Sequence, residues 1–336
     1  MVRWGLVGCG DISNKRVAPA IKEQPESRLS AVVSPFGDEL EAFMKKHDVA
    51  RGYADIDTML ADEDIDAVYV AVPVYLHHEM AMKALRAGKH VLVEKPMAMD
   101  DKQCEDMIDM ARSRNIKLGI AYFRRFFPKI KDIKEMIAGG IIGDIIQVRI
   151  LYHSWYDPDI TEKANWRLIK SMAGGGPLWD MGCHKFDMLV DLFDLPESVF
   201  GFTDTLTHSY EVEDSCSVLL KLKNGAHCIS SFNWNSKIWA DEFEILGTAG
   251  KIILDPCDSD RLLLRLVPHV IKGIGREDTC ISRPNHINVH YPLIDDFVKA
   301  MIDNREPRVT GEEGYKTNRI LCAVGESAAT GKRISI

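Results

Sequence analysis

Two spacings of apolar residues alternate along the first 120 positions of the chain. Short runs of consecutive apolar residues, typical of buried strands, lie at 4–7, 29–33, 67–72, 90–93 and 117–121. Segments with apolar residues at helical spacing separate them, at 12–24, 38–48, 76–88 and 100–114. Strands that alternate with helices indicate a parallel sheet covered on both faces. With right-handed crossovers, the pattern predicts a doubly wound α/β domain over residues 1–121.

The pattern changes after residue 122. Strand-like runs now follow one another, at 144–154, 217–222, 228–232, 242–246 and 251–254. Asn224-Gly225 between two of these runs is a hairpin signal. Helical spacing recurs at 128–138, from Asp180 onward, at 292–304 and at 312–331, whereas 255–290 shows no clear period. Successive strands favour a largely antiparallel sheet, so we predict an α+β domain over residues 122–336.

Composition excludes several classes of protein. The net charge is −8 and no block of Lys or Arg occurs, so a nucleic-acid partner is not expected. No apolar run reaches the roughly 18 residues that span a membrane. The eight cysteines form no C-x-x-C pair, which argues against a zinc ribbon or a disulfide scaffold. Since Met1 leads directly into a strand-like run without a signal peptide, we expect a cytoplasmic protein.

A glycine-rich turn follows the first predicted strand. Gly8 and Gly10 are followed by Asp11, Ile12 and Ser13 at the start of the first predicted helix. The first glycine allows a tight turn, and the second lets a pyrophosphate approach the backbone. The N–H groups at the start of a helix favour an anion. The alternative is a plain strand–helix turn, but the position within a βαβ pattern favours a dinucleotide-binding Rossmann domain.

The end of the second predicted strand bears on the choice of cofactor. Ser34 occupies the position where an acid would bind the ribose hydroxyls of NAD, or near which an Arg would bind the 2′-phosphate of NADP. No Lys or Arg occurs between Arg28 and Lys45. The acids in this interval are Asp38, Glu39 and Glu41. A 2′-phosphate would lack a positive partner here, so the sequence favours NAD over NADP.

Glu94-Lys95-Pro96 lies at the carboxyl end of the fourth predicted strand. Ligands of open α/β sheets bind at this edge. Pro96 restricts Lys95 to an extended conformation, which fixes the direction of the lysine. An ammonium group there is suited to stabilise negative charge on a substrate oxygen. The alternative is an exposed lysine before a turn.

A second candidate site follows the glycine run 174–176. Asp180, His184 and Asp187 recur at i, i+4 and i+7, so on a helix they share one face. Histidine is the side chain that ordinarily titrates near neutral pH, and Asp180 is suited to orient it or to bind a substrate hydroxyl. Three alternatives stay open: Asp180 caps the helix, His184 is a buried and satisfied histidine, or the three residues bind a metal. We expect no metal, because hydride transfer from a nicotinamide needs none.

Aromatic and arginine side chains lie between these motifs. Aromatic faces stack on sugar rings, and arginine binds hydroxyls and carboxylates. The alternative is that the aromatics belong to the core. The candidate substrate-binding residues of this kind are Tyr122, Arg124, Trp155, Trp166 and Arg167.

With these motifs in place, the chain resembles the Gfo/Idh/MocA oxidoreductases, the group of glucose–fructose oxidoreductase and inositol 2-dehydrogenase. The resemblance covers nearly the whole chain. The similar segments are 8–13, 94–96, 124–126, 175–187 and 309–314. The family's Pro-Asn-x-x-His motif appears as Pro73 to His77, without the Asn.

The resemblance implies a catalytic set of Lys95, Asp180 and His184. His184 would be the general acid/base, and Lys95 would polarise the reacting oxygen. The implied cofactor-binding residues are Gly8, Gly10, Asp11, Ile12, Ser13, Ser34, Val72, Pro73, His77, Glu94, Lys95 and Pro96.

The function expected is NAD(P)-dependent hydride transfer at a hydroxyl-bearing carbon of a sugar, sugar derivative or polyol. Two alternatives stay open. One is a dehydrogenase of trans-dihydrodiols, and the other is a cofactor-binding sensor without turnover. We also expect a homodimer or homotetramer, formed through the face of the second sheet that does not line the active site.

Overall fold

The computed structural model describes residues 1–159, 163–266 and 278–336. The chain divides into two compact units. Unit 1 comprises Met1–Phe123 and His286–Asn318, and unit 2 comprises Arg124–Asn285 and Arg319–Ile336. The expected boundary at residue 121 is close to this division, but 286–318, expected in the second domain, packs with the first.

Side-chain and backbone contacts explain this correction. Phe297 lies with its ring 5.6 Å from that of the fully buried Trp4, and Thr310 forms a β-bridge with Gly119. The Asn318 amide donates to Ala98 O at 2.7 Å and its oxygen accepts from Met97 N–H at 3.0 Å. The C-terminal segment therefore completes the core of unit 1.

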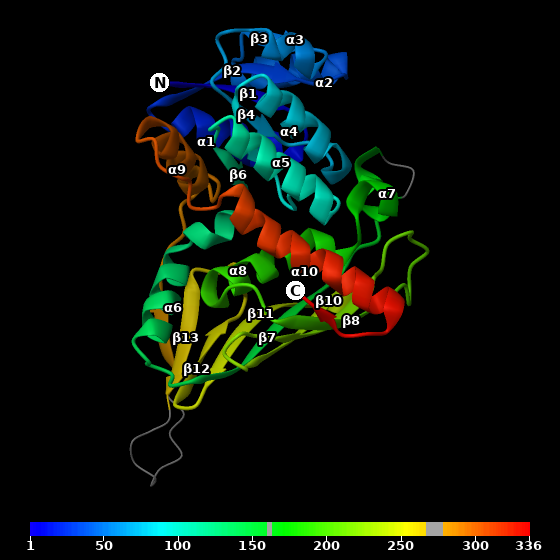
Figure 1. The fold of residues 1–336 in the computed structure, drawn as a ribbon, viewed down its shortest axis with the longest axis vertical. Helices are drawn as coiled ribbons and strands as arrows, with labels where there is room; N and C mark the ends of the chain where they lie inside the picture. Colours follow the sequence, from blue (N-terminus) through cyan, green and yellow to red (C-terminus); the bar gives the residue numbers. More distant parts are fainter. Residues whose placement is uncertain (160–162, 267–277) are drawn as a thin grey trace. The chain divides into compact units, whose positions relative to one another are not determined.

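Unit 1 is built on a parallel sheet with strand order β3-β2-β1-β4-β5-β6 (Figure 1). Its strands are β1 (Val2–Val7), β2 (Ser27–Val33), β3 (Arg51–Tyr53), β4 (Ala67–Val70), β5 (His90–Val93) and β6 (Leu118–Ile120). The edge strand β3 was not predicted, because its three residues include only one apolar side chain. The doubly wound α/β prediction is confirmed.

The helices of unit 1 carry their apolar faces toward this sheet. They are η1 (Ser13–Val17), α1 (Ala18–Glu23), α2 (Gly37–His47), α3 (Ile56–Leu60), η2 (Val74–Leu76), α4 (His77–Arg86), α5 (Asp101–Ser113), η3 (Phe123–Phe126) at its boundary, and α9 (Tyr291–Ile302). Helix α4 packs beside α5, and α1 packs beside α9 (Figure 1). The long helix α10 (Gly311–Thr330) begins in unit 1 and ends in unit 2.

Unit 2 is built on a sheet with strand order β14-β13-β12-β11-β7-β10-β9-β8-β15. Its strands are β7 (Ile145–Trp155), β8 (Ser198–Asp204), β9 (Ser215–Lys221), β10 (His227–Asn233), β11 (Asn235–Gly247), β12 (Gly250–Leu254), β13 (Arg261–Leu266), β14 (Thr279–Ser282) and β15 (Ile334–Ser335). Only β7 and β10 pair in parallel among these strands. The largely antiparallel α+β prediction is confirmed, and Gly225 turns the predicted hairpin with φ +87°.

One face of this second sheet is covered by helix. The helices of unit 2 are α6 (Pro128–Ala138), η4 (Lys163–Leu168), α7 (Lys170–Ala173), η5 (Leu178–Gly182) and α8 (Cys183–Phe193). Phe186 of α8 meets Phe232 of β10 edge to face at 5.3 Å. Lys185 pairs with the buried Asp241 of β11. Within the described residues, no helix is both long and apolar enough to cross a membrane.

Candidate active site

The loop after β1 has the geometry of a phosphate cradle. Gly8 has φ +104°, and a Cβ there would lie 2.3 Å from Ala71 O, so only glycine fits. A Cβ at Gly10 would meet nothing within 4 Å, which leaves its backbone open to an incoming group. These two glycines thus have different roles, and the open one fits a pyrophosphate.

The helix that follows supports this loop. The Asn14 amide donates to Cys9 O at 2.7 Å and to Gly10 O at 3.2 Å. These hydrogen bonds fix the loop to the first turns of the helix. Ser13 is fully buried, as close packing of the third fingerprint position requires. Asp11 and Ile12 are more exposed, and Asp11 pairs with Lys15 at 2.7 Å. The segment therefore offers a rigid backbone to an anion.

Ser34, at the end of β2, has an acidic neighbour that the sequence did not single out. Its hydroxyl donates to Glu39 Oε2 at 3.1 Å, and it accepts from Phe36 N–H at 3.3 Å. Burial raises the pKa of the Cys9 thiol to about 12, and the Glu39 charge adds to this shift. Glu39 is thus close to both the glycine loop and the end of β2.

His77 connects the two loops that follow β4 and β5. Its ring nitrogens lie 2.9 Å from Pro96 O and 2.9 Å from Val72 O, and the side chain is buried. Burial lowers the pKa of His77, although the surrounding carbonyls oppose the shift. The structure therefore places His77 as a brace between the Val72-Pro73 and Glu94-Lys95-Pro96 segments, with both nitrogens engaged by backbone.

Glu94 lies in a buried polar cluster directly before Lys95. Tyr69 donates to Glu94 Oε1 at 2.8 Å, His290 Nε2 lies 3.4 Å from the same oxygen, and the Lys95 N–H donates to Oε2 at 3.2 Å. Burial opposes ionisation, but the contacts with His290 and Tyr69 outweigh it and lower the pKa of Glu94. His290, packed on Phe123 at 4.8 Å, was missed because nothing in its local sequence indicates this contact. The cluster holds the half-buried Lys95 at the carboxyl edge of the sheet.

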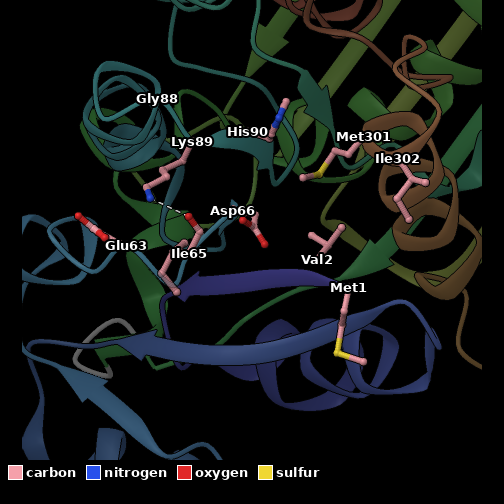
Figure 2. Close-up of a pocket in the computed structure, with 10 residues that line it drawn as sticks. All are labelled: Met1, Val2, Glu63, Ile65, Asp66, Gly88, Lys89, His90, Met301 and Ile302. Atoms are coloured by element: carbon pink, nitrogen blue, oxygen red, sulfur yellow. Dashed lines mark hydrogen bonds between the residues drawn. The ribbon is translucent and has the colours of Figure 1, made fainter.

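A hollow in unit 1 lies at the opposite edge of the sheet. It has a volume of about 450 Å³ and is lined by residues before β4 and at the starts of β1 and β5, among them Val2, Asp66 and His90 (Figure 2). These are the amino ends of the parallel strands, whereas ligands of this fold bind at the carboxyl ends. We therefore do not assign this hollow to the candidate site.

In unit 2, η5 and α8 carry the predicted Asp–His face. His184 is buried and Asp187 is fully buried, where it accepts from Arg125 Nε at 2.9 Å. Asp180 is partly exposed, with Arg167 Nε 3.8 Å from its Oδ1. Because Pro177 is the residue before the first turn, Asp180 is not the helix cap. The described residues contain no group of three His, Cys, Asp or Glu suited to hold a metal.

The start of this helical segment is held by Glu213. Its carboxylate faces Gly175, where a Cβ would lie 3.1 Å from Glu213 Oε1. A Cβ at Gly176 would lie 2.0 Å from Glu213 O, which explains the glycine. Burial raises the pKa of Glu213, and the nearby backbone of Gly176 and Leu178 lowers it by less. The Glu213 carboxylate therefore faces the backbone at the start of the helical segment.

Aromatic side chains gather beside Asp180. Arg167 lies over the Trp166 ring at 4.6 Å, and Tyr156 and Trp234 are 4.6 Å apart. Tyr152, Tyr156 and Trp166 pack on the buried cluster that contains Trp234. The Asp180 charge is felt by Tyr152 and Tyr156, whose phenol pKa values are raised mainly by burial. Unit 2 thus brings together an acid, an arginine and several aromatic faces.

Two predicted substrate residues of unit 2 lie away from Asp180, and a third belongs to unit 1. Trp155 alternates with Tyr152 along β7, so it lies on the other face of the sheet, against His208 at 4.7 Å. Arg124 is buried and bound through two nitrogens to Asp258, at 2.7 and 2.5 Å. Tyr122 is fully buried in unit 1. Trp155 and Arg124 thus do not lie with Asp180, and Tyr122 belongs to the other unit.

Two family models match the chain. The model of the oxidoreductase family with an NAD-binding Rossmann fold matches residues 2–122, and that of the GFO/IDH/MocA C-terminal domain matches residues 130–253. The chain is 29% identical to 1,5-anhydro-D-fructose reductase of Ensifer adhaerens, over 100% of this chain and 99% of that protein. It is 29% identical to trans-1,2-dihydrobenzene-1,2-diol dehydrogenase of Xenopus tropicalis, over 76% of each.

A solved structure has the same fold over the whole length. It is the aldose-aldose oxidoreductase from Caulobacter crescentus complexed with glycerol, with a TM-score of 0.88, 26% identity, and coverage of 100% of this chain and 99% of that chain. The comparisons therefore extend over both units.

Proposed function

Because the chain belongs to the GFO/IDH/MocA oxidoreductase family, we propose that it transfers a hydride between NAD(H) and a hydroxyl-bearing carbon of a sugar, sugar derivative or polyol. The observation that carries the proposal lies within unit 1. The open glycine loop after β1 and Lys95 after β5 occupy the same carboxyl edge of the sheet. Relatives named as acting on anhydrofructose and on aldoses support a sugar-like substrate.

The residues divide the work between binding and proton transfer. The glycine loop and the start of η1 bind the pyrophosphate, while Ser34 and the segments that His77 braces border the rest of the cofactor. The bound nicotinamide supplies the hydride acceptor or donor. Lys95 donates a hydrogen bond to the substrate oxygen and stabilises its negative charge. His184 takes or returns the hydroxyl proton, and Asp180 orients it or the substrate.

The substrate side belongs to unit 2. Trp166 and Tyr156 offer aromatic faces for a sugar ring, and Arg167 beside Asp180 offers hydrogen-bond donors for its hydroxyls. The same aromatic faces suit the ring of a trans-dihydrodiol, and one relative carries that name. This second substrate class uses the same proton chemistry.

We also propose that the protein works in the cytoplasm. All eight cysteines lie in the described residues and none is in a disulfide, as expected in a reducing compartment.

The proposal is tested by following nicotinamide absorbance with purified protein. NAD+ and NADP+ are each offered with a panel of sugars, polyols, anhydro sugars and a trans-dihydrodiol, and the reverse reaction is run with the reduced cofactors. Turnover with a sugar or polyol is the expected result. Turnover confined to the dihydrodiol selects the second substrate class. Tight cofactor binding with no turnover on any substrate favours a sensor.

A further inference from the structure

We propose that Glu39, on helix α2, selects NAD(H) over NADP(H) by accepting hydrogen bonds from the ribose hydroxyls that a 2′-phosphate would replace. This inference rests on the proposed function and names the residue that would decide the cofactor. In dinucleotide-binding folds an acid usually ends the second strand and performs this task. Here that position is Ser34, and the acid comes from the following helix.

The contact between the two residues places the carboxylate at the strand end. Ser34 is buried, and its hydroxyl donates to Glu39 Oε2 at 3.1 Å. The same hydroxyl accepts from Phe36 N–H at 3.3 Å, so the turn between β2 and α2 is tied to the contact. Glu39 itself is exposed and lies in the first turn of α2. Its second oxygen is therefore available to a group arriving from solvent.

The electrostatics of the glycine loop agree with this placement of the Glu39 carboxylate. Cys9 lies between Gly8 and Gly10. The Glu39 charge raises the pKa of the Cys9 thiol, and a hydrogen bond with the Ser34 hydroxyl lowers it. The Glu39 carboxylate therefore lies near the carboxyl ends of both β1 and β2. These two neighbouring strands flank the ribose side of such a site. A carboxylate at this point accepts from two vicinal hydroxyls, as an acid ending β2 would.

The surrounding charge disfavours a 2′-phosphate. The start of α2 would by itself attract an anion, but Asp38 and Glu39 occupy its first turn and oppose this. No Lys or Arg occurs between Arg28 and Lys45. The Lys46 ammonium, two turns beyond Glu39, donates to Asn14 Oδ1 at 3.2 Å, and Asn14 in turn binds the glycine loop. The nearest positive charge on this face of α2 is therefore bound to Asn14 and not directed at a 2′-phosphate.

The experiment is a fluorescence titration of the full-length protein with NADH and NADPH at one ionic strength. Glu39→Gln removes the charge at the proposed position, and Glu41→Gln removes the same charge from an exposed position on the other side of α2. We expect wild type to bind NADH more tightly than NADPH. Glu39→Gln should weaken NADH binding roughly tenfold, as for lost hydrogen bonds to a charged group, and should not weaken NADPH binding. Glu41→Gln should match wild type.

A second variant tests the same position by an expected gain of affinity for NADPH. Glu39→Arg should reverse the preference in favour of NADPH, because it replaces repulsion with a partner for the 2′-phosphate. Thermal unfolding of each variant verifies that the fold is kept.

Two outcomes overturn the inference and are distinguishable. If wild type binds both nucleotides but Glu39→Gln behaves like Glu41→Gln, or if wild type prefers NADPH, Glu39 is not the selecting residue and the proposed hydride transfer stands. If wild type binds neither nucleotide, the proposed function fails and the assignment of Glu39 fails with it.

Discussion

Gly8 and Gly10 are two residues apart in one loop, yet a side chain would have different effects at the two positions. At Gly10 there is open space, so Gly10→Val should fold normally and lose detectable binding of NADH, because its methyl groups occupy the place of the pyrophosphate. At Gly8 the φ of +104° and the close Ala71 O oppose any side chain, so Gly8→Val should cost roughly 1–3 kcal/mol or more of stability. Calorimetric binding beside thermal unfolding separates the two. Wild-type affinity in Gly10→Val would contradict the loop assignment.

Lys95 and His184 carry the proposed chemistry at the residue scale. Lys95→Met and His184→Ala should each reduce turnover by roughly 10²–10⁴-fold with nearly unchanged cofactor affinity, because the glycine loop holds the cofactor. Asp180→Asn should reduce turnover less. Steady-state kinetics with the identified substrate, together with cofactor titrations, measure both effects. Lys102→Met on the exposed side of α5 is a matched control. Near wild-type turnover in both variants would remove them from the catalytic set.

At the scale of the element, the start of η5 depends on Glu213. Glu213→Gln keeps an oxygen beside the backbone of Gly176 and Leu178 and removes the cost of a buried charge, so it should fold and turn over like wild type. Glu213→Ala removes that oxygen and should cost about 1–2 kcal/mol, with a loss of turnover because Asp180 and His184 follow on the same helical segment. Equal behaviour of the two variants in denaturant unfolding and kinetics would show that the Glu213 oxygen does not stabilise this segment.

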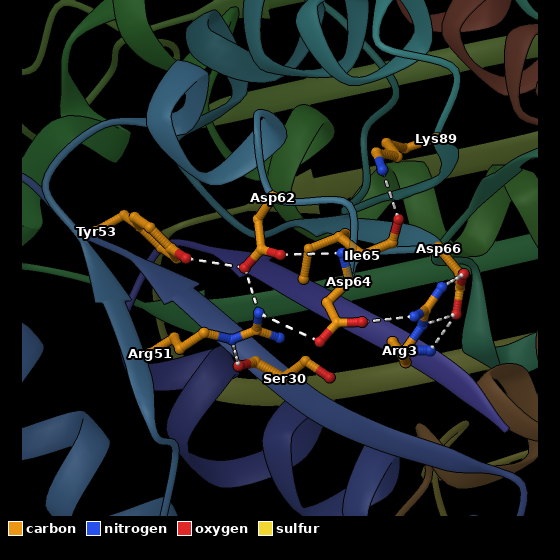
Figure 3. Close-up of polar contacts among 9 residues, drawn as sticks. All are labelled: Arg3, Ser30, Arg51, Tyr53, Asp62, Asp64, Ile65, Asp66 and Lys89. Atoms are coloured by element: carbon orange, nitrogen blue, oxygen red, sulfur yellow. Dashed lines mark hydrogen bonds and ion pairs between the residues drawn. The ribbon is translucent and has the colours of Figure 1, made fainter.

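The amino ends of the strands in unit 1 are joined by an ion-pair network (Figure 3). Arg3 donates to Asp66 through Nε at 2.8 Å and a terminal nitrogen at 2.6 Å, and to Asp64 at 2.7 Å, while Arg51 pairs with Asp62. The hydrogen bonds from Arg3 lower the pKa of Asp66 more than burial raises it. Its stabilising contribution is therefore complete above the ordinary pKa of 3.8 and is lost as the pH falls through the lower folded value.

This network gives a prediction with a defined pH dependence. Asp66→Asn should lower the Tm at pH 7 by roughly 2–4 °C, since the pairs are partly exposed. The difference from wild type should shrink below pH 3.8, where wild-type Asp66 begins to lose its charge. Asp109→Asn, on an exposed pair with Arg112, should show no such difference. A Tm difference between wild type and Asp66→Asn that did not change with pH would mean that the charge of Asp66 contributes nothing to stability.

At the scale of the whole molecule, we predict a homodimer or homotetramer formed through the second sheet. On the face opposite α8, Leu219 of β9 lies directly beside Ile229 of β10, and they are 51% and 43% exposed. Phe202 of β8 is 59% exposed. Exposed apolar side chains in adjacent strands favour a self-complementary interface.

Light scattering tests this prediction. A mass at or above twice 37.8 kDa is expected at micromolar concentration. Leu219→Lys with Ile229→Lys should shift the protein toward the monomer, because it buries two charges in the interface. Ile302→Lys, at an equally exposed site in unit 1, should leave the mass unchanged. A wild-type monomer would refute the prediction.

The sequence by itself determined the elements and the chemistry-bearing motifs. Strand and helix periods depend on neighbours within a few residues, so β1, β5, α6 and the Asn224-Gly225 hairpin were predicted close to their observed bounds. The glycine loop and Lys95 were identifiable because a strand end and a glycine spacing are local patterns.

Only the tertiary structure decided which side chains meet. Glu39 reaches Ser34, His290 reaches Glu94 across nearly 200 residues, and Glu213 reaches the start of η5, and no local period encodes such contacts. The same holds for Arg124, whose charge is taken by Asp258, and for the return of 286–318 to unit 1. These contacts form because folding buries polar groups that must find partners, and the partners come from wherever the chain passes.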